Sequence, residues 1–149
     1  MDERFLDVGI PTYILQPIVE NSLVHGMEPM IGTCTIRIRI REQGGCLVIS
    51  VWDDGQGITP EKLKQLMAGT GESRHIGIRN VQDRIQMLYG KEYGLTIRSE
   101  YHEYTEVRLR LPLRCGSVSY THLDVYKRQI YYLYRKITRN IIIQLKIRI

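Results

Sequence analysis

The sequence predicts an α+β domain built as a two-layer sandwich, and three observations lead to this prediction. Three stretches alternate apolar with polar or charged residues, as strands with one buried face do: 35–41, 95–99 and 105–111. A mostly apolar run, 46–52, follows the first of them closely enough to form a hairpin with it. Apolar residues recur at helical spacing in three further stretches, 14–24, 60–67 and 78–88. Hairpins separated by helices favour a layer of helices packed on one sheet.

The first helical stretch contains two prolines that bear on where the helix begins. Pro11 suits the first turn of a helix, and Gly26 suits its C-terminal cap. Pro17 lies inside the apolar pattern, so we expect a kink or a restart of the helix there. The apolar face consists of Ile14, Leu15, Ile18, Val19 and Leu23.

Glycine and proline mark the remaining boundaries. Gly44-Gly45 predicts the turn between the first two strands, and Pro60 predicts the start of a short helix. Residues 69–75 are polar and rich in glycine, which is typical of a loop. Gly90 ends the third helical stretch, and Pro112 marks the edge of the last alternating strand.

The formal net charge of +5 would suggest an anionic partner, but the basic residues are unevenly distributed. Seven of the 21 Lys and Arg residues, and only one of the 16 Asp and Glu residues, lie in 117–149. Residues 1–116 are therefore near −1, and we expect no nucleic-acid partner. Cys34, Cys46 and Cys115 show no Cys-x-x-Cys spacing, which favours structural thiols. Five cations interrupt residues 130–149, so we expect no membrane span there.

The segment 117–149 has the features of a non-native tail. Residues 118–129, Val-Ser-Tyr-Thr-His-Leu-Asp-Val-Tyr-Lys-Arg-Gln, can be encoded by a DNA palindrome centred on CTAG. This segment resembles a translated sequencing-transposon adapter joined to its own reverse complement. Residues 130–149 are rich in Ile, Tyr, Lys and Arg, as translated AT-rich DNA would be. We therefore expect one domain in residues 1–116 and an artefactual tail in 117–149, with a basic membrane-surface helix as the alternative for the tail.

Two motifs point to nucleotide chemistry. Residues 20–26, Glu-Asn-Ser-Leu-Val-His-Gly, precede residues 53–57, Asp-Asp-Gly-Gln-Gly, by about thirty positions. Together they resemble the N-box and first glycine box of the GHKL (Bergerat-fold) ATP-binding domain. Ile10-Pro11 and Leu15-Gln16-Pro17-Ile18-Val19-Glu20-Asn21 are similar to the group of sensor histidine kinases typified by YesM and LytS. The resemblance covers roughly residues 8–112 and implies about three helices on one face of a mixed, mainly antiparallel sheet.

The carboxylate of Asp53 can accept the exocyclic amine of adenine, whereas it would repel the carbonyl of guanine. Gly55 and Gly57 allow the backbone to approach a nucleotide and to take positive φ. The amide oxygen of Asn21 suits Mg²⁺ that bridges phosphates, with Glu20 as a further candidate. His25 lies one helical turn beyond Asn21 and could reach a phosphate.

By resemblance, the cofactors are ATP and Mg²⁺, and the catalytic role of Glu20 and His25 stays open. The second glycine box and the following helix would supply Gly77, Arg79 and Asn80 to the phosphates, and Thr105 would bind near the adenine. The family pattern is broken at His75 and Tyr104, where glycine is usual.

Hydrolysing members of the superfamily carry a glutamate at the position of Pro17, which offers no base. The resemblance therefore implies a histidine kinase catalytic domain that donates phosphate to a histidine on a separate dimerisation domain, with a response regulator as further partner. It also implies a cytoplasmic domain of a parent in the bacterial inner membrane, and a fragment that is inactive alone. A non-catalytic ATP-binding regulatory module and an anti-sigma-type serine kinase are the alternatives.

Overall fold

The computed structural model describes residues 10–11, 13–25, 33–68, 76–113, 120–121 and 142–148. Three helices and four strands follow one another in the predicted order: α1 (Gln16–His25), β2 (Thr33–Gln43), β3 (Cys46–Asp53), α2 (Pro60–Ala68), α3 (Ile76–Tyr89), β4 (Gly94–Glu100) and β5 (Tyr104–Pro112). A short strand, β1 (Ile10–Pro11), precedes them, and β6 (Tyr120–Thr121) and β7 (Ile142–Arg148) follow.

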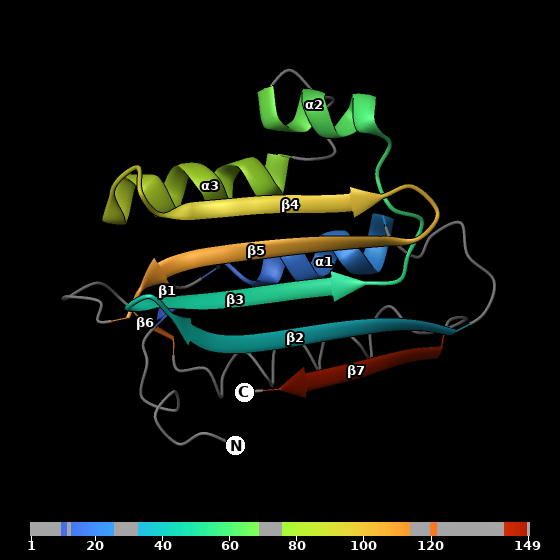
Figure 1. Ribbon diagram of the computed structural model, residues 1–149, viewed down its shortest axis with the longest axis horizontal. Coiled ribbons are helices and arrows are strands. Elements are labelled where there is room, and N and C mark those ends of the chain that lie inside the picture. Colours follow the sequence, from blue (N-terminus) through green and yellow to red (C-terminus); the bar gives the residue numbers. More distant parts are fainter. Residues whose placement is uncertain are drawn as a thin grey trace.

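The main sheet has five strands in the order β4-β5-β3-β2-β7 (Figure 1). All neighbouring strands are antiparallel except β2 and β7, which are parallel. The four strands of the body are thus all antiparallel, and the one parallel pair involves β7 of the tail. The mainly antiparallel sheet agrees with what the family resemblance implies. Gly44 and Gly45, both with positive φ, form the turn of the β2–β3 hairpin, where glycine avoids the steric cost of a left-handed backbone.

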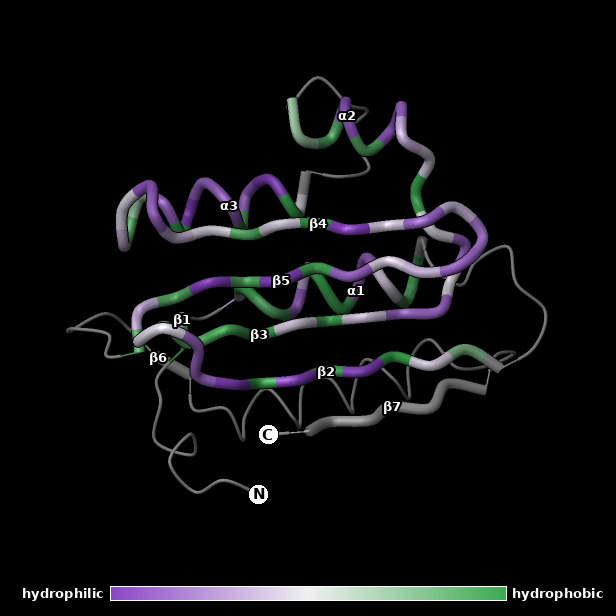
Figure 2. The backbone as a smooth tube through the Cα atoms, viewed as in Figure 1, coloured by the Kyte–Doolittle hydropathy of each residue, from purple (hydrophilic) through white to green (hydrophobic). Residues whose placement is uncertain are grey.

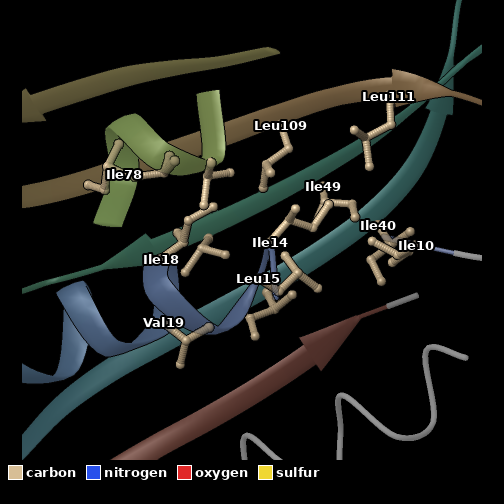
Figure 3. Packing of buried hydrophobic residues seen from close by; sticks show 14 of the residues in the cluster. Ile10, Ile14, Leu15, Ile18, Val19, Ile40, Ile49, Ile78, Leu109 and Leu111 are labelled. Carbon is tan, nitrogen blue, oxygen red and sulfur yellow. The ribbon is translucent and has the colours of Figure 1, made fainter. Parts of the chain in front are cut away.

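Helices α1 and α3 lie together on one side of the sheet (Figure 1). Helix α1 packs on β3 and on α3, and α3 packs on β4 and β5. Figure 3 shows how α1, α3, β2, β3 and β5 contribute side chains to a single core. The largest fully buried side chains of this core are Ile10, Ile14, Leu15, Ile18, Ile36, Leu47, Ile49, Ile85, Leu109 and Leu111. Each such side chain contributes roughly 1.5–3 kcal/mol by leaving water.

Hydrophilic and hydrophobic residues alternate along stretches of the strands (Figure 2), and this alternation divides the sheet into an inner and an outer face. On β2, Ile36, Ile38 and Ile40 are buried against the helices, while Arg39 and Arg41 are exposed on the other side. The period of two in the sequence therefore becomes one face in the core and one face in water.

Helix α1 begins later than Pro11, which corrects the prediction for the first helix. Ile10 and Pro11 form β1, which pairs with β6. Tyr13 has a φ of 64°, and this left-handed conformation interrupts any helix that would start before it. The helix starts at Gln16, so Pro17 lies in its first turn, where a missing N–H costs no helical hydrogen bond. The restart expected at Pro17 is thus the start of the helix itself.

Two segments of the tail pair with the body, which the sequence analysis did not anticipate. Strand β7 pairs with β2 from Thr33↔Ile142 to Arg39↔Arg148. Without β7, β2 would be an edge strand with unpaired backbone groups, and such an edge can pair with a β-prone segment of almost any origin. Residues 142–148 contain three isoleucines and a leucine and suit that role.

Among the described residues, no helix is long and apolar enough to cross a membrane. The loop expected at 69–75 lies outside the described residues.

Candidate functional site

Asp53 is a buried carboxylate at the end of β3, beneath α1. Only 1% of its surface is exposed, and its register partner on β5 is Thr105. Burial raises the pKa of Asp53 to about 6, although hydrogen bonds to the side chain of Ser22 and the backbone of Gly55 lower it, and the nearby charge of Asp54 raises it. The carboxylate can still be ionised near neutral pH.

The neighbouring Asp54 has a different, structural task. Its Oδ1 accepts hydrogen bonds from the backbone N–H of Thr35 (2.6 Å) and from the Sγ of Cys34 (2.9 Å). These bonds tie the end of β3 to the start of β2. Burial, together with this hydrogen bond, raises the pKa of the Cys34 thiol well above its usual range. Of the two adjacent carboxylates, Asp53 is the buried candidate for the site, and Asp54 connects β3 to β2.

The glycine-bearing loop after β3 is braced against the turn between β4 and β5. The backbone N–H of His102 donates to the carbonyl oxygen of Gln56 (2.6 Å). Gly57 has a φ of 68°, and a Cβ added there would overlap the backbone carbonyl of Glu100. Glycine is therefore required at this position by both backbone conformation and space.

Gly55 differs from the prediction, because it is not among the glycines with positive φ. Its N–H turns back to the Oδ1 of Asp53 (3.2 Å), in the manner of an Asx turn. Gly55 is buried, and its hydrogen bond helps to orient the carboxylate.

Ser99 on β4 connects the glycine loop to Thr105. The Oγ of Ser99 accepts from the N–H of Ile58 (2.8 Å) and donates to the carbonyl oxygen of Tyr104 (2.7 Å). A third contact, 3.0 Å, joins it to the Oγ1 of Thr105. A hydroxyl has one hydrogen to donate, so Thr105 must donate in this pair. The lone pairs of the Thr105 hydroxyl remain available as acceptors.

Gly77 lies where α1 and α3 approach each other. A Cβ at Gly77 would lie 3.3 Å from the Cβ of Pro17, so glycine allows close packing of the two helices at that point. The first turn of α3 also carries Arg79 and Asn80, both exposed. Arg79 forms an ion pair with Asp83 (3.9 Å). In exposed positions such a pair contributes little stability.

The N-box residues lie on α1. Asn21 and Glu20 are half-buried, and the Oε1 of Glu20 accepts from the Nε2 of Gln16 (2.9 Å). His25 ends the helix, and its side chain lies outside the described part of the chain. The same holds for residues 69–75, which include His75 of the expected second glycine box.

Two residues of the site were missed by the sequence analysis, and both had left a signal. Ser22 stands four positions after Ile18, on the apolar face of α1, and is 2% exposed. Ser99 lies on the same inward face of β4 as Leu95 and Ile97, because the three are alternate residues of the strand. A polar residue at an apolar-face position needs a partner, and in both cases the partner belongs to the site.

The carboxylate of Asp53 keeps capacity to accept a further hydrogen bond. An ionised carboxylate can accept about four hydrogen bonds, and the contacts of Asp53 with Ser22 and Gly55 leave room for an amine donor. No group of three or more His, Cys, Asp and Glu side chains in the described residues could hold a metal ion. A magnesium ion bound here would take most of its ligands from phosphates and water, as is common for this metal.

The fold and the site together define a nucleotide-binding α+β sandwich. Residues 7–115 match the family model described as histidine kinase-, DNA gyrase B-, and HSP90-like ATPase. The chain belongs to this family.

Similar proteins include three sensor kinases. The chain is 36% identical to the sensor histidine kinase YesM of Bacillus subtilis, over 76% of this chain and 19% of YesM. It is 37% identical to the sensor histidine kinase YpdA of Escherichia coli, over 69% of this chain and 18% of YpdA. It is 33% identical to the sensor protein LytS of Bacillus anthracis, over 72% of this chain and 19% of LytS.

Among solved structures, the fold is similar to a histidine kinase domain from the blue-light activated histidine kinase of Erythrobacter litoralis EL346. The TM-score is 0.52 at 19% identity, and the match covers 68% of this chain and 45% of that one. This likeness concerns the fold alone. The chain spans about a fifth of the length of the sensor kinases that it matches.

Proposed function

We propose that this chain is the ATP-binding catalytic domain of a sensor histidine kinase, which holds Mg-ATP for phosphoryl transfer to a histidine on a separate dimerisation domain. The observation that carries the proposal is the buried Asp53, whose carboxylate keeps acceptor capacity at the end of β3. The parent would be an inner-membrane protein with this domain in the cytoplasm and a response regulator as its partner.

Asp53 would select adenine by accepting its exocyclic amine, because guanine presents a carbonyl oxygen at the same place. Thr105 supports this role, since its hydroxyl directs its hydrogen to Ser99 and offers lone pairs on the same inner face. Both groups are buried, so hydrogen bonds to them gain strength from the low local dielectric.

Asn21 and Glu20 would serve the metal, and Gly77, Arg79 and Asn80 would lie towards the phosphates. The metal ion that Asn21 and Glu20 would hold would supply neutralisation of the charge on the transferred phosphoryl group. The chain contributes the position of the nucleotide: the brace between Gln56 and His102 and the close fit of Gly57 keep the loop in one place. In the transfer, the bond between the γ-phosphorus and its bridging oxygen breaks, a phosphorus–nitrogen bond forms, and ADP leaves.

Pro17 argues against hydrolysis and against the serine-kinase alternative. It occupies the position of the catalytic glutamate in hydrolysing relatives and offers no base. Gly77 packs against it. Positioning and charge neutralisation are therefore the means of catalysis that this site supports.

Titration calorimetry of the chain with Mg-ATP and Mg-GTP tests the nucleotide assignment. We expect ATP to bind more tightly than GTP, and Asp53→Ala to remove most of the binding. Glu61→Ala, an exposed carboxylate on α2, is the matched control and should bind as the unmodified chain does. Equal affinity for the two nucleotides would remove the adenine assignment.

A phosphate-release assay and a phosphotransfer assay test the reaction. The chain alone should hydrolyse ATP negligibly and should not phosphorylate itself. A histidine-bearing dimerisation domain supplied in trans should accept the γ-phosphoryl group. ATP binding without transfer to that domain would favour the non-catalytic regulatory module, while rapid phosphate release would show that another residue activates water.

A further inference from the structure

The outer face of the sheet, opposite the helices and Asp53, carries an array of arginines. In the described strands β2–β5, six outward positions are arginine and none is lysine: Arg37, Arg39, Arg41, Arg98, Arg108 and Arg110. The register brings them into rows. Arg39 and Arg108 flank Ser50, and Arg41 and Arg110 flank Val48. We call these six residues the arginine face.

The positive charge of the arginine face is not balanced on the same surface. The outward acids of β2–β5 are Glu100 and Glu106. Glu106 forms an ion pair with Arg108 (2.9 Å). Six cations against two acids leave about +4 on one face of a body whose overall charge is near −1. Arginines on alternate strands lie roughly 10 Å apart, given the spacing of strands, so their potentials add.

A mostly nonpolar strip on β3, formed by Cys46, Val48 and Trp52 with Ser50 among them, runs through the middle of the arginine face. Cys46, Val48 and Ser50 are buried although they point away from the helices. The guanidinium of Arg37 lies over the ring of Trp52, 4.7 Å from its centre, and the Nε of Arg110 donates to the Sγ of Cys46 (3.3 Å). The side chains of Arg37 and Arg110 thus lie against residues of this strip. Nonpolar centres with arginine and tryptophan are typical of protein interfaces.

We propose that the arginine face is a docking surface for another protein that presents a cluster of Asp and Glu side chains. A guanidinium binds a carboxylate through two parallel hydrogen bonds, so an ordered array of arginines recognises an ordered array of acids. The surface lies on the side of the sheet away from Asp53, and its occupation leaves the nucleotide site open.

Two other classes of partner fit this face less well. A membrane-binding surface needs exposed apolar side chains to insert. The exposed large apolar residues of the described chain are Tyr13, Val24, Met67, Met87 and Tyr101, and none stands at an outward strand position of the sheet. A surface for single-stranded nucleic acid uses aromatic rings as stacking platforms, and the ring of Trp52 is already covered by Arg37.

Trp52 provides a direct test, because it is the one tryptophan of the chain. We expect a decaglutamate peptide to change the fluorescence of Trp52 with a saturable binding curve that weakens as salt is added. In the double variant Arg39→Glu/Arg98→Glu, we expect the affinity to fall about tenfold or more, the range in which interface arginines act.

The matched control is Lys64→Glu/Lys91→Glu, two exposed lysines on the helix side with the same change in net charge. It should keep the affinity for decaglutamate within about twofold, as expected for charges outside an interface. Calorimetry should give the same ATP affinity for both double variants, which separates this proposal from the nucleotide assignment.

Three results would overturn the proposal. The first is no binding of decaglutamate, or equal losses in the two double variants, which would reveal a general charge effect or binding to the basic tail. The second is tighter binding to phosphatidylglycerol vesicles that depends on the arginine face, which would make it a membrane surface. The third is tighter binding to a single-stranded oligonucleotide that depends on the arginine face, which would make it a nucleic-acid surface.

Discussion

Helices α1 and α2 both lie near the motif of residues 53–57, but they differ in how much of their surface is buried against the rest of the domain. Helix α1 buries Ile14, Leu15, Ile18, Val19 and Leu23, counting the two residues that lead into it. Helix α2 buries no residue. A cavity of about 210 Å³ lies between α2, α3 and β4. Its lining includes Leu66, Ile78 and Leu95, and Arg79 with Asp83.

The difference separates a fixed part of the site from a loosely covered part. Asp53, Ser22 and Thr105 belong to the fixed part, where close packing holds side chains in one arrangement. Arg79 belongs to the loosely covered part, where it lines the cavity beside α2 and is exposed. We infer that adenine would be recognised by preformed groups, whereas the side of the site near α2 has less packing to hold it. Regions with few buried apolar contacts open at low free energy.

The largest effect on stability should come from truncating an apolar side chain that packs α1 or α2 against the rest of the domain. Ile18→Ala removes a fully buried side chain of α1 and should lower the free energy of unfolding by about 2–5 kcal/mol. Leu66→Ala removes a half-buried side chain of α2 beside an existing cavity and should cost about 1 kcal/mol. Urea denaturation of both variants measures the difference. Equal losses would show that α2 is attached as firmly as α1.

An intermediate effect should come from the charge buried in the fixed part. The folded-state pKa of Asp53, about 6, lies above the ordinary value of 3.8 for this side chain. Between these pH values the folded chain binds more protons than the unfolded chain, so the contribution of Asp53 to stability decreases as pH rises towards 6 and stays low above it. Asp53→Asn should therefore raise the free energy of unfolding at pH 7 by about 3 kcal/mol.

The measurement is urea denaturation at pH 4.5 and pH 7 for both chains. The gain from Asp53→Asn should shrink at the lower pH, where the carboxyl group is largely protonated in the folded chain. A gain of equal size at both pH values would mean that the buried charge is not its cause. The same variant should bind ATP less well, because the amide has only one acceptor oxygen.

The smallest effect should come from the tail. We propose that residues 117–149 are not part of the domain, and the end of the family match at residue 115 supports this boundary. Deleting the tail should change the free energy of unfolding by no more than about 0.5 kcal/mol, although β7 pairs with β2. It should also move the net charge from +5 to near −1. A loss of several kcal/mol would show that β7 is needed by the sheet.

Much of the fold could be predicted because its signals are local. Alternation of side chains gives β2, β4 and β5, helical spacing gives α3, and Gly44-Gly45 gives the turn of the first hairpin. Asp53 was identified as a candidate from its motif, and the structure places it in a buried position at a strand end. The start of α1 was less predictable. The left-handed Tyr13, which precludes a helix from Pro11 through that residue, carries no sequence signal of its own.

The sequence by itself determined the period of each element and the residue types at the motifs, because both depend on neighbours within a few positions. Tertiary structure alone decided which distant residues meet: Ser22 with Asp53, Ser99 with Ile58, Gly77 with Pro17. It also gathered the six arginines of β2, β4 and β5, because strand register sets which residues lie side by side. Register and helix packing result from burying one shared core, and no local window of sequence contains that information.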